Sequence, residues 1–173
     1  MARCIVYTRA DGHITVVNLA WGSGPRLFGK TDDEFLDYVI QHDVLARPDG
    51  QGPADGQTYY VMEDTAVPTE LRYFREAWEC PNGVIKVNMP KARVIHMDRI
   101  RKKRNEELQK LDIPFTIAVE RNDKTMMEKI TVQKQKLRDI PQKYDLSSFK
   151  TPEELKAFWP KELEELDEKI KEV

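Results

Sequence analysis

The sequence predicts an α+β fold: a small amino-terminal antiparallel sheet with one helix, followed by a helical carboxy-terminal half. Two observations lead to this prediction. Residues 3–8 and 14–19 are rich in Ile, Val, Tyr and Thr, and Asp11-Gly12 lies between them. Asp-Gly between two such runs indicates a hairpin, because glycine adopts the positive φ that the turn needs. Further along, residues 89–141 carry apolar side chains mostly three to four positions apart, which is the period of a helix.

Composition, prolines and turn residues divide the chain into four parts. Prolines and turn residues separate one apolar pattern from the next. The expected parts are a ββαβ unit over residues 1–64, a connecting aromatic arm or hairpin over residues 65–88, a helical hairpin over residues 89–141, and carboxy-terminal helices over residues 142–173 that bind a partner.

The amino-terminal helix has a clear start signal. Thr31-Asp32-Asp33-Glu34 fits a capping box, so a helix is expected from here to about His42. The segment before it, from Gly24 to Thr31, is expected to be a loop. Residues 47–57 are expected to form a second, longer loop, because their Gly, Pro and Asp residues offer little to bury.

Composition also limits the class of protein. The 173 residues include 40% apolar and 34% charged side chains with a net charge of −2, so no general attraction to nucleic acid or to an anionic membrane is expected. No apolar run reaches the roughly 18 residues that a membrane span needs. Cys4 and Cys80 match no metal-ligand spacing and are expected to be free thiols, with a disulfide as the alternative if their strands are neighbours.

The helical half begins at Asn88, which is a candidate N-cap followed by a proline in the first turn. An apolar stripe is expected along this first helix, and Pro114 is expected to break or kink the chain. A short helix with Ile117 and Ala118 should follow. The stripe of the first helix comprises Met97, Ile100, Leu108 and Leu111, and the next helix should carry Met126, Ile130, Gln133, Leu137 and Ile140 in 4-3-4-3 spacing before Pro141 closes the unit.

The end of the chain is expected to contact another protein. Thr151-Pro152 starts a helix, and Trp159 lies just before the helix-breaking Pro160. The last segment is mainly charged and carries a narrow apolar stripe, which is typical of a coiled-coil seam. The candidate partner-binding residues are Leu137, Ile140, Trp159, Leu163, Leu166 and Ile170.

One short motif suggests nucleotide binding as an alternative. The segment from Gly24 to Thr31 fits G-x-x-x-x-G-K-[ST], the pattern of a phosphate-binding loop. Leu27 and Phe28 are bulky where backbone amides must approach phosphate. Three carboxylates at residues 32–34 then occupy the start of the helix that an anion would need. The favoured interpretation is therefore a capped helix, with P-loop-like nucleotide binding as the alternative.

The remaining polar residues indicate no catalytic site. The basic run at residues 99–104 lacks the interleaved aromatics that stack on bases, and it is interpreted as a solvated helix face. His13, His42 and His96 have no second metal ligand three or four positions away. We expect no enzyme activity, no cofactor and no metal.

The second half of the chain carries a series of short motifs, namely Arg104-x3-Leu108, Asp112, Glu120-Arg121-Asn122-Asp123, Gln135-Lys136-Leu137-Arg138-Asp139-Ile140-Pro141 and Trp159-Pro160. Through these motifs it resembles the tail fibre assembly proteins of bacteriophages. These tail assembly chaperones end in a Tyr-Arg-Gln-x-Leu-Arg-Asp-Ile-Pro-like helix end followed by Trp-Pro. Gln133-Lys134 replaces the Tyr-Arg pair here, and Ile113 follows Asp112 where the family usually has tryptophan.

The resemblance implies a non-catalytic tail-module protein of a phage or prophage that acts by protein–protein contact. Two roles stay open: a structural component of the virion, or an assembly chaperone that covers a tail fibre and then leaves. Its partners would be other tail or fibre proteins, and homo-oligomerisation is a further expectation. The protein would be found in the host cytoplasm during assembly, and in the virion if it is structural.

Overall fold

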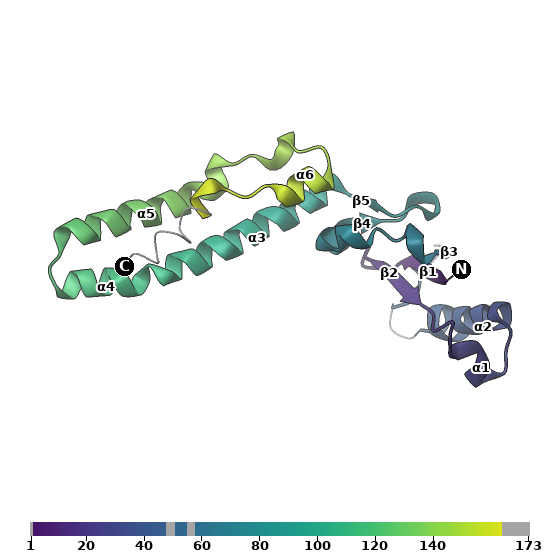
Figure 1. Cartoon of the computed structure of the whole chain (residues 1–173). Helices are drawn as coiled ribbons and strands as arrows, with labels where there is room; N and C mark the ends of the chain where they lie inside the picture. The colour runs from purple at the N-terminus through teal and green to yellow at the C-terminus, as the bar shows by residue number, and fades with distance from the viewer. Residues whose placement is uncertain (1, 48–50, 55–57, 164–173) are drawn as a thin grey trace. The chain divides into compact units, whose positions relative to one another are not determined.

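A computed structural model describes residues 2–47, 51–54 and 58–163 of the chain. It confirms the α+β class, with short strands early in the chain and long helices after residue 88 (Figure 1). The chain divides into two compact units, Met1–Asn88 and Met89–Val173, and each is described by itself.

The first unit is built on a three-stranded antiparallel sheet. Its strands are β1 (Arg3–Thr8), β2 (Ile14–Asn18) and β3 (Tyr60–Glu63), in the order β2-β1-β3. The β1–β2 hairpin pairs Ile5 with Val17 and Tyr7 with Thr15. Gly12 in its turn has a φ of 79°, so the hairpin predicted from Asp11-Gly12 is confirmed.

Strand β1 is buried on both faces because each face of the sheet is covered. Side chains alternate between the faces of a strand. Ile5 and Tyr7 accordingly belong to one apolar cluster with Phe35, Leu36 and Val39 of the first long helix. On the other face, Cys4 and Val6 pack with a different set of residues, which comprises Ile14, Trp78, Cys80 and Ile85.

Two helices follow β2, and the first corrects a sequence-based expectation. The segment predicted as a loop contains a short helix, α1 (Gly24–Phe28). Helix α2 (Asp32–Val39) then begins at the predicted capping box, which is confirmed: Thr31 Oγ1 accepts from the Glu34 amide, and the Glu34 side chain accepts from the Thr31 amide. A π-helical turn, Ile40–Leu45, continues the helix beyond Val39.

The arm predicted for residues 65–88 belongs to the core of the first unit. After a 3₁₀ turn at Asp64–Ala66, it contains the 3₁₀ segment Thr69–Ala77 and a small hairpin of β4 (Trp78–Glu79) and β5 (Lys86–Val87). A 3₁₀ turn at Pro81–Gly83 joins the two strands, with positive φ at Asn82 and Gly83. Because Trp78 and Ile85 pack against β1 residues, this arm completes the core.

The second unit is a helical hairpin with a carboxy-terminal segment packed on it. Its helices are α3 (Met89–Lys110), α4 (Asp112–Glu120), α5 (Lys124–Lys143) and α6 (Pro152–Ala157) (Figure 1). Helix α3 contacts both α5 and α6. A short 3₁₀ turn at Leu146–Ser148 lies between α5 and α6.

The buried stripe of α3 differs from the predicted one. Ile100 and Leu111, the residue after α3, are buried as expected, but Met97 and Leu108 are only half-buried. The remaining fully buried positions of α3 are Ala92, His96 and Glu107. The stripe is therefore rotated toward two polar residues, His96 and Glu107, which were not part of the predicted stripe.

Pro114 lies in the first turn of α4, where a helix tolerates proline. It is the third residue of α4, and Leu111 precedes that helix as its cap. Asn122 has a φ of 52° between α4 and α5, and the Asp123 carboxylate caps α5 by accepting from the Met126 amide at 3.0 Å. The break predicted near Pro114 is confirmed, because Leu111 separates α3 from α4.

The predicted seam of α5 is confirmed, but its end is not where the sequence placed it. Ile130, Leu137 and Ile140 are buried. Pro141 lies inside the helix, which continues to Lys143. Proline removes one backbone donor, and a position in the last turn limits the disruption that this causes.

Candidate protein-binding surfaces

The helix in segment 24–31 uses the backbone amides that a phosphate would need. The Leu27 amide donates to Ser23 O at 3.0 Å, and the Lys30 amide donates to Pro25 O at 2.8 Å. A phosphate-binding loop instead leaves such amides free to point at the anion. The geometry therefore does not support the P-loop interpretation.

The two glycines and the lysine of that motif have structural explanations. A Cβ on Gly24 would lie 2.2 Å from the Phe35 ring, so only glycine fits there. Gly29 has a φ of 60° and caps α1 in the left-handed conformation, which favours glycine. The Lys30 ammonium lies 5.6 Å from the centre of the Tyr38 ring, in a cation–π contact.

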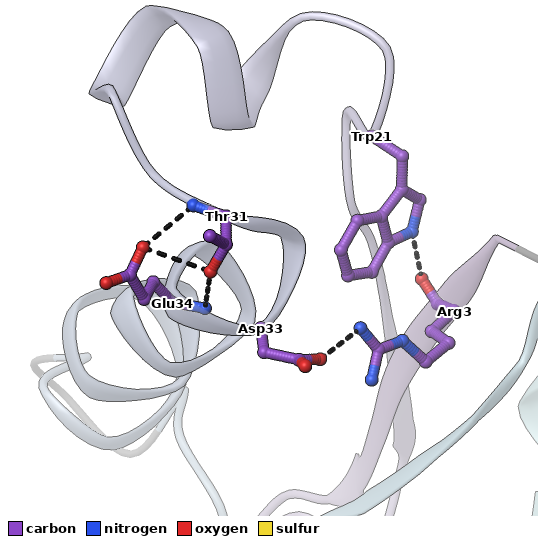
Figure 2. A network of polar contacts seen from close by, with 5 residues as sticks. All are labelled: Arg3, Trp21, Thr31, Asp33 and Glu34. Atoms are coloured by element: carbon purple, nitrogen blue, oxygen red, sulfur yellow. Dashed lines mark hydrogen bonds and ion pairs between the residues drawn. The ribbon is translucent and has the colours of Figure 1, made fainter.

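A polar network connects the start of α2 to the sheet (Figure 2). Arg3 Nη2 donates to Asp33 Oδ1 at 2.8 Å, and the Arg3 guanidinium lies 5.0 Å from the centre of the Trp21 ring. The Trp21 indole in turn donates to Arg3 O at 2.7 Å. In the capping box beside it, two hydrogen bonds from Thr31 hold the Glu34 carboxylate and lower its pKa. The Thr31 hydroxyl thus serves as the cap of α2, and its position is explained without a bound cation.

Helix α1 exposes apolar side chains. Leu27 is 80% exposed and Phe28 is 49% exposed. The Phe28 ring also packs against two rings of α2: its centre lies 5.8 Å from that of Phe35 and 4.9 Å from that of Tyr38. These contacts fix the position of Phe28. A fixed, exposed apolar pair of this kind is a candidate protein contact.

Three of the predicted partner-binding residues lie in the interior. Leu137, Ile140 and Leu163 are each 0% exposed. Their side chains are covered within the chain, so we assign them to the core and correct the partner-binding interpretation. The physical reason is that the same apolar spacing suits packing against a helix of the same chain and packing against a partner protein. Sequence spacing does not distinguish the two.

Trp159 is half-buried against α3. Its ring meets the His96 ring edge-on at 5.3 Å, and the Lys103 ammonium lies 5.6 Å from its centre. The segment that carries it is fixed further by Glu162, which accepts hydrogen bonds from Lys143 and from the Tyr144 hydroxyl. Leu166 and Ile170 lie outside the described residues.

Helix α4 carries an exposed apolar face that the sequence analysis missed. Ile113 is 70% exposed and Ile117 is 40% exposed. Four residues separate them, so they share one face of the helix, whereas Ala118 is buried on the inner side. The i, i+4 spacing was a usable signal, but Pro114 within it was interpreted as a break.

Helix α4 is anchored so that this face stays outward. Lys134 Nζ of α5 lies 2.7 Å from Asp112 Oδ1 and 4.8 Å from the centre of the Phe115 ring. The Lys134 side chain is only 13% exposed, but the Asp112 side chain is 66% exposed, so the carboxylate of this ion pair is solvated. The anchor fixes the first turn of α4 against α5.

Other reactive residues gather at no site in the described ranges. No group of three or more His, Cys, Asp or Glu residues there can hold a metal ion. Cys4 and Cys80 are buried free thiols in the same cluster, and burial raises the pKa of both. Within the described part of the chain, no helix is long and apolar enough to cross a membrane.

Comparison with known protein families, curated proteins and solved structures finds no match to this chain.

Proposed function

We propose that the chain is a non-catalytic tail-module protein of a phage or prophage that acts through protein–protein contact. It either stays in the virion as a structural component or serves as a tail fibre assembly chaperone. The observation that carries the protein-contact part is the exposed apolar face of α4, formed by Ile113 and Ile117. The tail assignment comes from the resemblance around Leu137 and Trp159.

The geometry of α4 supports a contact role for physical reasons. Exposed apolar area costs about 25 cal/mol per Å² relative to burial, so a contiguous apolar face gains free energy when a partner covers it. Isolated exposed residues such as Val94 and Val132 need no such explanation, because every protein surface has them. Ile113 and Ile117 differ in that they share one helical face.

The proposal also gives the motif at residues 135–141 a structural role. Leu137 and Ile140 pack the inner face of α5 and thereby support the hairpin that presents α4. In this interpretation the motif maintains the scaffold, while the partner contacts lie on exposed surfaces. A substitution in the motif would then act through stability.

The experiment compares particles produced with the wild-type chain and with the double variant Ile113→Asp, Ile117→Asp. Val132→Asp is the matched control, because Val132 is 55% exposed and lies on the outer side of α5. Mass spectrometry of purified particles measures whether the chain is present, and electron microscopy scores the fibres.

Presence of the wild-type chain in particles, with loss of the double variant, supports the structural role. Absence from particles, with fibres lost only in the double variant, supports the chaperone role. The proposal would be contradicted by normal fibres with both the wild type and the double variant, together with no trace of either chain in the particles. This holds provided that the double variant unfolds at the wild-type temperature.

A further inference from the structure

Each unit of the chain carries an exposed apolar pair on one of its helices. The α1–α2 surface consists of Leu27 and Phe28 on α1 together with the carboxylates of α2. The α3–α4 surface consists of Ile113 and Ile117 on α4 together with the exposed Arg101 and Lys102 on α3, the helix that α4 contacts.

The two surfaces carry opposite charge. Helix α2 has four exposed acidic residues and no basic one, namely Asp32, Asp33, Glu34 and Asp37. The run on α3 at residues 99–104 has five basic residues and no acidic one, and its exposed members are Arg101 and Lys102. The same asymmetry holds for the whole units: residues 1–88 contain 8 basic and 13 acidic residues, whereas residues 89–173 contain 20 and 17.

We propose that the α1–α2 surface of one molecule docks on the α3–α4 surface of a second copy of the chain. The apolar pairs would bury each other, and the carboxylates of α2 would face the basic run of α3 around them. This inference rests on the proposed function, since it names a second copy as one partner of a contact protein.

The contact is heterologous, because two different surfaces meet. A symmetric dimer uses the same surface twice, whereas a heterologous contact leaves one surface of each type unused at the ends. Molecules therefore add head to tail, into a ring if the rotation closes and into an open chain if it does not. Charge complementarity mainly sets orientation and association rate, so the association should weaken as salt screens the charges.

The test is sedimentation velocity of the purified full-length chain over a range of concentrations, at low and high salt. The expected result is association that increases with concentration and decreases with salt. Leu27→Asp should abolish it, and Ile113→Asp with Ile117→Asp should abolish it separately. Val132→Asp, which changes an exposed residue outside both surfaces, should leave it intact.

Mixing the two non-associating variants gives the decisive measurement. Leu27→Asp keeps a working α3–α4 surface, and the double variant keeps a working α1–α2 surface, so the mixture should form a heterodimer and nothing larger. A monomeric wild-type protein at every concentration, or a mixture that stays monomeric, would overturn the inference. Neither result bears on the proposed function, because the particle experiment tests that function separately.

Discussion

His96 and Phe158 are joined by a hydrogen bond of 2.8 Å across 62 residues of sequence, from the imidazole Nε2 to the backbone carbonyl oxygen. The carbonyl only accepts, so this bond assigns the proton of the neutral ring to Nε2. His96 is 0% exposed and also supports Trp159. A polar residue thus attaches the carboxy-terminal segment to α3.

The first prediction follows from this burial. Burial lowers the pKa of His96 below its ordinary value of 6.5, and the Arg99 charge adds to the effect. The unfolded chain then takes up the proton before the folded one does as pH falls. The stabilising contribution of neutral His96 is complete above the unfolded pKa and is lost as pH falls from about 6.5 toward the folded pKa.

Urea unfolding at pH 7.5 and pH 5 measures this loss. His96→Gln keeps a side-chain donor for Phe158 O without titrating, so its free energy of unfolding should change less between the two pH values. His42→Gln, at an exposed position, is the control and should follow the wild type. Equal pH dependence in the wild type and His96→Gln would contradict the prediction.

A second prediction concerns the core of the helical hairpin. Leu137→Ala should lower the free energy of unfolding by about 2–5 kcal/mol, because it removes a fully buried side chain and leaves a cavity. Val132→Ala, on the exposed side of the same helix, should change it by less than about 0.5 kcal/mol. Denaturant titration of both variants checks the difference, and equal effects would show that α5 is not oriented as described.

A third prediction separates the cap from the nucleotide motif. Thr31→Ala should destabilise the protein by about 1 kcal/mol through loss of the capping hydroxyl, and Thr31→Ser should retain most of the stability. Titration calorimetry with magnesium–ATP should show no binding heat for the wild type. Micromolar binding that Lys30→Ala abolishes would restore the P-loop interpretation.

Glu107 gives a fourth prediction. It is 2% exposed, and Lys110 Nζ lies 2.8 Å from its Oε1, whereas its buried Oε2 has no hydrogen-bond partner in the structure. Replacing a poorly satisfied buried charge by an apolar side chain is often neutral or stabilising. Lys110 is half exposed and stays hydrated without Glu107.

Glu107→Leu should therefore match or exceed the wild-type free energy of unfolding, by an amount on the order of 1 kcal/mol. Thermal unfolding measures it, with Glu106→Leu at a neighbouring exposed position as the control. A loss above about 1 kcal/mol would mean that both carboxylate oxygens are satisfied in solution.

The parts of the fold that local chemistry determines were predictable from the sequence. The caps at Thr31 and Thr151, the Asp11-Gly12 turn and the seam of Ile130, Leu137 and Ile140 each follow from residues near in sequence. They need no knowledge of what lies across the core, so pattern and propensity suffice.

The parts that depend on distant contacts were not predictable. Helix α1 forms where Gly24 lies against the Phe35 ring, and segment 24–31 by itself resembles a loop. His96 and Glu107 occupy the inner stripe of α3, although their polarity favours the surface. The exposed surfaces were missed for the same reason: which apolar residues remain uncovered depends on the complete set of packed neighbours.

The last prediction divides the end of the chain at Leu163. Leu163 is 0% exposed, and Glu162 accepts hydrogen bonds from Lys143 and Tyr144, so the chain up to this point belongs to the fold. Leu163→Ala should cost about 2–5 kcal/mol. Residues 164–173, with Leu166 and Ile170, are still predicted to bind a partner, so deleting them should keep the melting temperature and reduce incorporation into particles or fibre assembly. A large fall in melting temperature on deletion, with assembly intact, would show that Leu166 and Ile170 stabilise the fold as Leu163 does.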